Sequence, residues 1–485
     1  MSLKVYNSLT KRKEAFVPLK EGEVTMYVCG PTVYDLSHIG HARSAVSFDV
    51  IYRYLKYRGY RVSYARNYTD VDDKIINRAK EEGVAPEEVA ERNIKFFDED
   101  MEALGVELPT YRPKATETME RIIEVTKALV DKGSAYVVDG DVFFSVRKFP
   151  GYGRLAGKKI DELESGARVE VDERKVDPLD FALWKSSKPG EPWWESPWGR
   201  GRPGWHIECS AMCMEHLGDT LDIHGGGKDL AFPHHENEIA QSEAATGKPF
   251  VRYWLHNGFV NIERVKMSKS LGNILNIRDV LANHTRDAVR LFLLSSHYRS
   301  PIDYSEDSLK EAESAVERFY KTVERIYDEC PEVKTIEPDE AALAERLRPL
   351  MEAMDDDFNT AEVTGTVFKE VTRANKILDE AKSGGGGGGV GVTSPMFHEL
   401  SLILSLFREA GKILGTLNER PVDYFAGRKS RVGVPAKEIE GLIRERDDAR
   451  GRKDFKRADE IRAELLEKGV VLEDTAKGTV WAVKG

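Results

Sequence analysis

The sequence has no apolar run that approaches the ~18–20 residues a membrane span needs. Its first residues lack the apolar core of a secretory signal peptide. Only four cysteines occur among 485 residues, too few and too scattered for a disulfide framework. Together these absences argue against a membrane-embedded chain and against a disulfide-rich secreted one, and they predict a protein of the reducing cytoplasm.

An excess of basic residues is also missing, because the formal net charge is −11. That balance weighs mildly against a nucleic-acid partner. The charge is uneven, however. Residues 428–485 carry 15 Lys and Arg against 12 Asp and Glu, a balance of +3 that leaves −14 for the preceding 427 residues. A small basic C-terminal module on an acidic body would permit local contact with phosphates.

The N-terminal region shows the pattern of a parallel sheet. The chain is too long for one hydrophobic core, which predicts two to four domains. β-Forming residues at 24–28 run into the turn signal Cys29-Gly30-Pro31-Thr32. Apolar residues then recur at helical spacing over 41–55, Gly59 follows as a candidate C-cap, and 62–68 has the composition of a second strand. This order predicts a βαβ unit with a right-handed crossover.

The pattern changes after residue 115. Glycine, proline and tryptophan accumulate over 116–200, around a hairpin-like stretch at 136–144. We therefore expect this segment to be an insertion into the α/β domain. The sheet is expected to resume near Gly204, with strand-like stretches at 204–208 and 220–223.

Beyond Ser305 the apolar pattern becomes helical. Four long helices are predicted, over residues 309–330, 340–354, 361–378 and 396–417. The six glycines 384–389 predict a flexible tether between the last two, within a loop at 383–394. After Pro421 a linker is expected to lead to a final unit. That unit has a charged helix pair at 437–468 and short strands at 470–472 and 479–481.

The tetrapeptide His38-Ile39-Gly40-His41 stands where a strand delivers the chain to a helix N-terminus. That position offers unpaired N–H groups and the positive end of the helix dipole, which suits phosphate. Gly40 permits close approach of a nucleotide, and the imidazoles of His38 and His41 can donate to phosphate oxygens. A capping turn with two incidental histidines is the alternative, and the tetrapeptide alone does not decide between them.

Two further segments carry candidate nucleotide chemistry. Lys266-Met267-Ser268-Lys269-Ser270 is a polar loop whose lysines can stabilise charge on a leaving phosphate group, although such loops are also common on surfaces. The glycines 225–227 follow a short strand and can let the backbone approach a nucleotide, while Asp229 could accept from ribose hydroxyls. A glycine triplet alone is usually just a turn.

A candidate metal helix begins a few residues later. His234 and Glu238 are four residues apart, so on a helix they share one face and can hold one cation. Taken with the two signature motifs and their order around a βαβ unit, this segment resembles the class I aminoacyl-tRNA synthetases, specifically the cysteinyl-tRNA synthetase family. The resemblance extends nearly from end to end.

The resemblance implies an α/β fold with a Rossmann-like parallel-sheet catalytic domain. The implied boundaries are a catalytic first half at 1–115, a connective insertion at 116–200, a catalytic second half at 201–260, a lysine-loop and stem-contact region at 261–305, an α-helical anticodon-binding bundle at 306–420 and a small C-terminal α+β module at 428–485. The module would contact tRNA. The six-glycine run and Ala482, where the family commonly has an arginine, depart from the family pattern.

The resemblance also implies an activity. Cysteine would be activated with ATP to cysteinyl-adenylate and pyrophosphate, and then transferred to the 3′-terminal adenosine of tRNA(Cys). The implied catalytic residues are His38, His41, Lys266 and Lys269, and the implied ATP contacts are Gly40, His41, Gly226, Asp229 and Lys269. The implied substrate-binding residues are Thr69, Trp205 and His224, of which Thr69 and Trp205 could equally be core or capping residues. Mg²⁺ would accompany ATP, and a monomer is expected.

The residues that match the family's zinc ligands are Cys29, Cys209, His234 and Glu238, for one zinc ion per chain. Two thiolates, an imidazole and a carboxylate suit Zn²⁺, whereas soft sulfur disfavours Mg²⁺ and Ca²⁺. Cys213 and His235 are rival ligands, each close in sequence to a matched one. Because serine's hydroxyl is a poor soft-metal ligand, a zinc ion that binds the substrate thiolate would select cysteine over serine.

Two other functions share parts of this pattern. A ligase that joins cysteine to a small amine would keep the catalytic half, but the roughly 180 residues beyond Ser305 count against it. A non-catalytic RNA-binding relative would be expected to lose catalytic residues. All four implied catalytic residues are present, which favours the synthetase.

Overall fold

The structure is a computed structural model, and it describes residues 2–158, 160, 172–262, 265–266, 274–384, 393–430, 436–475 and 478–483. The chain divides into two compact units. The first comprises Met1–Ile277, Leu293–Tyr304 and Pro349–Val363, and the second comprises Arg278–Phe292, Ser305–Arg348 and Thr364–Gly485. Two sequence predictions lie outside the described residues: residues 267–273 of the lysine loop, which include Lys269, and glycines 385–389.

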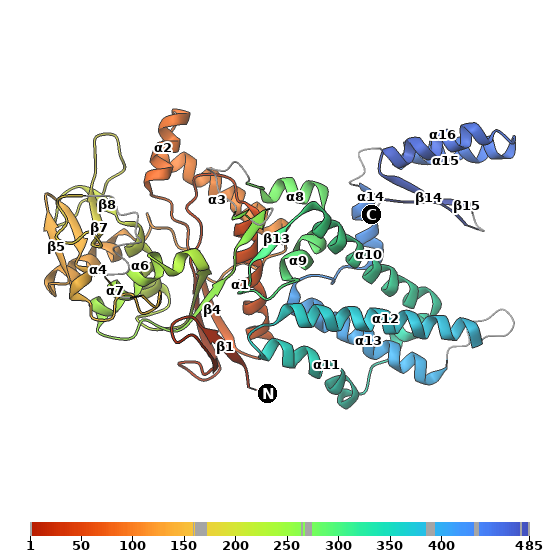
Figure 1. Cartoon of the computed structure of the whole chain (residues 1–485), viewed down its shortest axis with the longest axis horizontal. Helices are drawn as coiled ribbons and strands as arrows, with labels where there is room; N and C mark the ends of the chain where they lie inside the picture. The colour runs from red at the N-terminus through yellow and green to blue at the C-terminus, as the bar shows by residue number, and fades with distance from the viewer. Residues whose placement is uncertain are drawn as a thin grey trace. The chain divides into compact units, whose positions relative to one another are not determined.

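A four-stranded parallel sheet organises the first unit (Figure 1). Its order is β10-β9-β3-β4, from the strands Val251–Asn257, Leu221–Gly227, Glu23–Val28 and Arg61–Arg66. Val28 of β3 lies opposite both Arg66 of β4 and Gly225 of β9, so these strands end at one edge of the sheet. The predicted parallel sheet is confirmed, and its carboxyl edge is where such sheets bind ligands.

Helix α1 (Ile39–Tyr57) makes the crossover from β3 to β4. Its apolar residues at helical spacing, among them Ala42, Val46 and Phe48, are fully buried. His38 is the N-cap. Gly59 follows the C-cap Arg58 with a φ of 87°, the left-handed conformation that favours glycine after a helix. The helix predicted over 41–55 is therefore confirmed.

The strand expected at 204–208 is wrong, because residues from Trp205 onward form helix α6 (Trp205–His216). Ile207, Ala211 and Met214 recur at helical spacing and are buried in one hydrophobic cluster. The apolar period of this segment becomes visible only over twelve residues, so a five-residue window suggested a strand. Helix α7 (His234–Thr246) connects β9 to β10 and contains the predicted pair His234 and Glu238 on one helix.

The glycines 225–227 are not a turn, since β9 continues through them and pairs with residues 255–257 of β10. A Cβ atom on Gly225 would lie 2.2 Å from the Phe48 ring of α1. Glycine is therefore required here for the close packing of α1 on the sheet, one of the roles that glycines have in parallel-sheet nucleotide folds.

An antiparallel sheet of order β5-β6-β7-β8 interrupts the parallel one along the chain (Figure 1). Its strands are Ala135–Val138, Asp141–Phe144, Phe181–Ser186 and Gly201–Pro203. Asp139 and Gly140 both have positive φ in the tight turn between β5 and β6, as a two-residue hairpin needs. The predicted hairpin at 136–144 is confirmed, and helix α4 (Met119–Asp131) shares a hydrophobic cluster with this sheet.

The other named helices and strands of the first unit lie outside these two sheets. They are the hairpin β1 (Lys4–Asn7) and β2 (Arg12–Ala15), the helices α2 (Asp73–Glu82) and α3 (Pro86–Ala103), and the sheet of β12 (Val265–Lys266), β11 (Val260–Ile262) and β13 (Ile302–Tyr304). Lys266 ends β12, at the start of the lysine loop.

Helices dominate the second unit. Those lying wholly or partly in it are α8 (Ile277–Asn283), α9 (Arg286–Leu294), α10 (Glu306–Glu329), α11 (Glu340–Asp355), α12 (Thr360–Gly384), α13 (Ser394–Leu414), α14 (Pro421–Ser430), α15 (Ala436–Gly451) and α16 (Phe455–Glu467), and the strands β14 (Val470–Thr475) and β15 (Gly478–Val483) follow. The four long helices and the C-terminal helix pair are confirmed, but the linker expected after Pro421 begins as α14. None of the described helices is long and apolar enough to cross a membrane.

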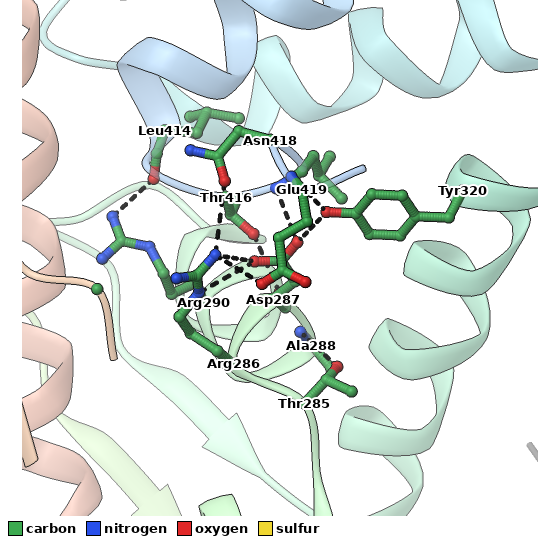
Figure 2. Close-up of polar contacts among 12 residues, drawn as sticks. Thr285, Arg286, Asp287, Ala288, Arg290, Tyr320, Leu414, Thr416, Asn418 and Glu419 are labelled. Carbon is green, nitrogen blue, oxygen red and sulfur yellow. Dashed lines mark hydrogen bonds and ion pairs between the residues drawn. The ribbon is translucent and has the colours of Figure 1, made fainter. Parts of the chain in front are cut away.

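Asp287, at the start of α9, is a buried polar hub of the second unit (Figure 2). Its carboxylate accepts from the Tyr320 hydroxyl of α10 at 2.5 Å and from the Leu417 N–H at 3.0 Å. The Tyr320 oxygen in turn accepts from the Glu419 N–H at 3.2 Å. Burial, together with the nearby Asp287 carboxylate, raises the pKa of Tyr320. These bonds fix α9, α10 and the turn after α13 to one another.

Candidate active site and metal centre

A cavity of about 380 Å³ lies at the carboxyl edge of the parallel sheet. Predicted site residues that line it come from four segments: Cys29 after β3, His38, Gly40 and His41 at the start of α1, Trp205 at the start of α6, and Asp229 after β9. These predicted site residues are far apart in the sequence, and the fold brings them to the lining of one cavity.

The two histidines of the signature motif interlock at the first turn of α1. The Gly40 N–H donates to His38 Nδ1 at 3.1 Å, and the His38 N–H donates to His41 Nδ1 at 3.2 Å. Their rings stack with centroids 3.9 Å apart. Because each Nδ1 accepts a backbone proton, Nε2 is the protonated nitrogen of each neutral ring. The motif therefore caps α1, as one of the two sequence alternatives predicts, and the same hydrogen bonds fix the orientation of both imidazoles.

The described segment that follows the lysine loop is bound to this same turn by backbone hydrogen bonds. The Ile39 N–H donates to the Leu275 carbonyl at 2.9 Å, and the Ile277 N–H donates to the Ser37 carbonyl at 3.0 Å. Residues 275–277 directly follow the lysine loop, whose other end is Lys266 in β12. Lys266 and Leu275, described residues before and after the loop, thus both belong to hydrogen-bonded parts of the first unit.

Arg43, which the sequence analysis did not identify, binds α1 to the segment that begins at the end of α9. Its buried guanidinium donates to the His297 carbonyl at 2.8 Å and to the Leu293 carbonyl at the end of α9. Burial lowers the pKa of Arg43 to about 10. A charged residue on an otherwise apolar helix face, two positions after His41, is the signal that could have identified it.

Four potential metal ligands converge beside the cavity. They are Cys29, Cys209 of α6, and His234 and Glu238 of the first turns of α7, and their ligand atoms all lie within 4.8 Å of one another. Cys29 Sγ lies 3.8 Å from Cys209 Sγ and 3.5 Å from Glu238 Oε1. His234 Nε2 lies 3.0 Å from Glu238 Oε1. These are the four residues that the family resemblance implies.

The rival ligands have different surroundings. His235 belongs to a second group of possible ligands, with Cys29, His224 and Glu238. Its Nδ1 lies 2.8 Å from His256 Nε2. Cys213 is fully buried in an apolar cluster and belongs to neither of the groups found among the described residues. Of the two rivals, only His235 is placed to reach a shared ion.

Burial makes the charge of this cluster unfavourable without a cation. It raises the pKa of Glu238 and of Cys29 well above their usual ranges. The hydrogen bond from the Cys29 thiol lowers the pKa of Cys209 to about 7. Among the described residues, the ion-pair partners of Glu238 are histidines only. A bound cation would allow all three acids to ionise together, so the cluster is compatible with a metal ion.

Three other predicted residues lie outside the described lining of the cavity. Thr69 is buried, and its hydroxyl accepts from Asn67 Nδ2 at 3.3 Å. His224 is fully buried, with Nε2 3.5 Å from Cys29 Sγ. A Cβ atom on Gly226 would lie 3.0 Å from the His235 ring, so this glycine leaves room for that ring. The side chain of Lys266 is outside the described part of the structure.

Family models match most of this chain. The model of the class I tRNA synthetase (C) catalytic domain matches residues 15–314, a DALR domain matches 350–418, and a cysteinyl-tRNA ligase anticodon binding domain matches 435–481. Over its whole length the chain is 54% identical to the whole of a cysteine–tRNA ligase from Geobacter metallireducens. Over 99% of its length it is 53% identical to the whole of the one from Thermodesulfovibrio yellowstonii. The chain belongs to the cysteine–tRNA ligase family.

Solved structures agree on the fold. A methionyl-tRNA synthetase from Mycobacterium tuberculosis, in complex with methionyl-adenylate, has a TM-score of 0.61 at 17% identity, over 86% of this chain and 95% of that one. A leucyl-tRNA synthetase from Agrobacterium radiobacter has a TM-score of 0.59 at 12% identity, over 84% and 86%. The chain thus shares its fold with these synthetases, and the class I family model and the curated relatives confirm the expected enzyme class.

Proposed function

We propose that the chain activates L-cysteine with ATP and transfers the cysteinyl group to the 3′-terminal adenosine of tRNA(Cys), while a zinc ion selects cysteine over serine. One observation carries the zinc part of the proposal. Cys29 both lines the cavity and belongs to the four-residue metal cluster. A substrate in the cavity would therefore have an ion within reach of its side chain.

The spacing of the two thiols supports zinc as that ion. Two thiolates bound tetrahedrally to one zinc at ~2.3 Å would stand about 3.8 Å apart. The separation of Cys29 Sγ and Cys209 Sγ is 3.8 Å. When bound, zinc would supply a Lewis acid that coordinates a thiolate and discriminates against a hydroxyl. Mg²⁺ would enter with ATP, since oxygen-rich cages for it are not expected here.

The activation step needs positioning and charge stabilisation rather than a protein nucleophile. The cysteine carboxylate attacks the α-phosphorus of ATP, and pyrophosphate leaves. His38 and His41, protonated on Nε2, would donate to phosphate oxygens as charge grows there, with Gly40 leaving room for the nucleotide. Lys266 and Lys269 would neutralise the leaving pyrophosphate, and Asp229 would accept from ribose hydroxyls.

Some of the predicted substrate-binding and ATP-binding residues would line the cavity, and others would act through the residues that they contact. Trp205 lines the cavity, and its ring lies 4.3 Å from the His234 ring, so it would cover the metal side of the pocket. His224 would act indirectly, through its contact with the Cys29 thiol. Thr69 would fix the segment after β4 through its hydrogen bond with Asn67. Gly226 would act indirectly, by leaving room for the His235 ring, whereas Asp229 lines the cavity itself.

The parts of the chain beyond the catalytic domain would serve tRNA. The domain boundaries given above at 116–200, 306–420 and 428–485 remain our proposal for the insertion, the anticodon-binding bundle and the tRNA-contacting module. The matches to a DALR domain and to an anticodon binding domain support tRNA rather than a small amine as the acceptor. We propose a monomer that works in the cytoplasm.

Pyrophosphate exchange into ATP tests the proposal, run with cysteine and then serine, with bound zinc quantified in the same sample. Exchange with cysteine only, at about one zinc per chain, is the expected result. Serine exchange equal to cysteine exchange would contradict zinc selection. Absent exchange despite bound zinc would favour the RNA-binding relative, and exchange without transfer to tRNA would favour the small-amine ligase.

A further inference from the structure

His206, which no sequence motif assigned to the site, faces the proposed ligand His234. The two Nδ1 atoms lie 2.9 Å apart, a hydrogen-bonding distance. On the other side of the same ring, His234 Nε2 lies 3.0 Å from Glu238 Oε1, inside the metal cluster. The His234 ring is therefore held at both nitrogens by residues of two different helices, α6 and α7.

A single proton can occupy the space between the two Nδ1 atoms. If it sits on His206, His234 Nδ1 accepts and Nε2 carries the remaining proton of a neutral ring. If it sits on His234, Nε2 keeps its lone pair and can bind an ion. A metal ligand needs the second arrangement, and the hydrogen bond made by the opposite nitrogen selects it.

We propose that His206 is a positioning residue for the metal centre, whose Nδ1 accepts the Nδ1–H of His234 and so keeps His234 Nε2 available to the ion. The inference rests on the proposed zinc site. It adds a residue that would touch neither the ion nor the substrate. It predicts that zinc affinity depends on the acceptor atom of His206 rather than on the bulk of its ring.

The position of His206 is itself fixed by its neighbours. Phe181 of β7 meets its ring edge-on, with centroids 5.5 Å apart. Gln241 of α7 donates to the His206 carbonyl at 3.0 Å and to the Ser210 hydroxyl at 2.9 Å. The antiparallel sheet and both helices therefore hold the backbone and the ring, so Nδ1 has a defined direction toward His234.

Three full-length variants separate the acceptor from the ring. His206→Phe keeps a planar ring without an acceptor, while His206→Asn places an amide oxygen near the position of Nδ1. His216→Phe, at the other end of α6 with its ring stacked on Tyr111, is the matched control. The measurement is zinc affinity by competition with a chelator of known affinity, together with the visible absorption of the Co²⁺-substituted protein.

His206→Phe should bind zinc about 10–100-fold more weakly, the usual effect of losing a hydrogen-bond partner of a metal ligand, and should alter the Co²⁺ spectrum. His206→Asn and His216→Phe should remain within about threefold of wild type. Equal loss in Phe and Asn variants, or unchanged affinity in both, would overturn the acceptor role while leaving the zinc site intact. A wild-type protein that binds no zinc would overturn the zinc site and this inference together.

Discussion

At the scale of single residues, the structure distinguishes candidate metal ligands between which the sequence could not choose. Cys209 and Cys213 are one helical turn apart on α6, so spacing could not choose between them. The fold does so because Cys209 Sγ lies 3.8 Å from Cys29 Sγ in a group of possible metal ligands, whereas Cys213 belongs to neither such group among the described residues. The four implied ligands come from three separate stretches of the chain, which is why a family resemblance identified the group and local spacing did not.

The same substitution at these two cysteines should have two different effects. Cys209→Ala should abolish stoichiometric zinc binding, because it removes one of two thiolates. Cys213→Ala should keep about one zinc per chain and lose only about 0.5–1.5 kcal/mol in the free energy of unfolding, as other small deletions in cores do. Metal content by elemental analysis and urea unfolding check both. Zinc loss in the Cys213 variant alone would reverse the assignment.

At the scale of elements, the helices of the C-terminal half were predictable because their apolar period persists over many turns. The catalytic half was harder to predict, since α6 is buried on several sides and the stretch 204–208, its N-cap and first four residues, resembles a strand. For the glycines 225–227 the sequence leaves a nucleotide contact and a turn as alternatives, whereas the structure places them inside strand β9. The role of Gly225 depends on Phe48, about 180 residues earlier, and no local sequence pattern indicates such a contact.

Gly225 therefore offers a test of how α1 packs on the sheet. Gly225→Ala should lower the free energy of unfolding of the first unit by about 1–3 kcal/mol, since the new methyl group would overlap the Phe48 ring. Gly365→Ala, in α12 with open space around its Cα, should instead stabilise the second unit by about 0.5–1 kcal/mol. Urea unfolding midpoints measure both. A neutral Gly225 variant would show that α1 can shift at no cost.

For the whole molecule, the sequence predicts the parallel sheet, the hairpin at 136–144 and the helices beyond Ser305, but not that the hairpin belongs to a four-stranded antiparallel sheet. It missed Arg43 and His206, whose partners lie on other elements. It also could not foresee how many histidines the fold buries around the cluster. His206, His224, His235 and His256 all have a pKa lowered chiefly by burial, so the folded state favours the neutral form of each ring.

His256 gives this burial a measurable consequence in acid. Its Nε2 lies 2.8 Å from His235 Nδ1 and its Nδ1 lies 2.8 Å from Ser8 Oγ. Burial, with a smaller effect from Lys228, lowers its pKa to about 3, against about 6.5 in an unfolded chain. Between these values the unfolded state binds one more proton, so stability is complete above about pH 6.5 and decreases toward pH 3.

Each such histidine contributes a slope of at most ~1.4 kcal/mol per pH unit. In the His256→Asn variant, the thermal midpoint should therefore fall less steeply between pH 6.5 and pH 5. The difference in slope should correspond to the uptake of about one proton fewer on unfolding. The measurement is best made in chelator, so that loss of metal does not add its own pH dependence. An unchanged slope in the variant would mean that His256 binds its proton equally well in the folded and unfolded states. The acid sensitivity would then have to come from the other buried histidines.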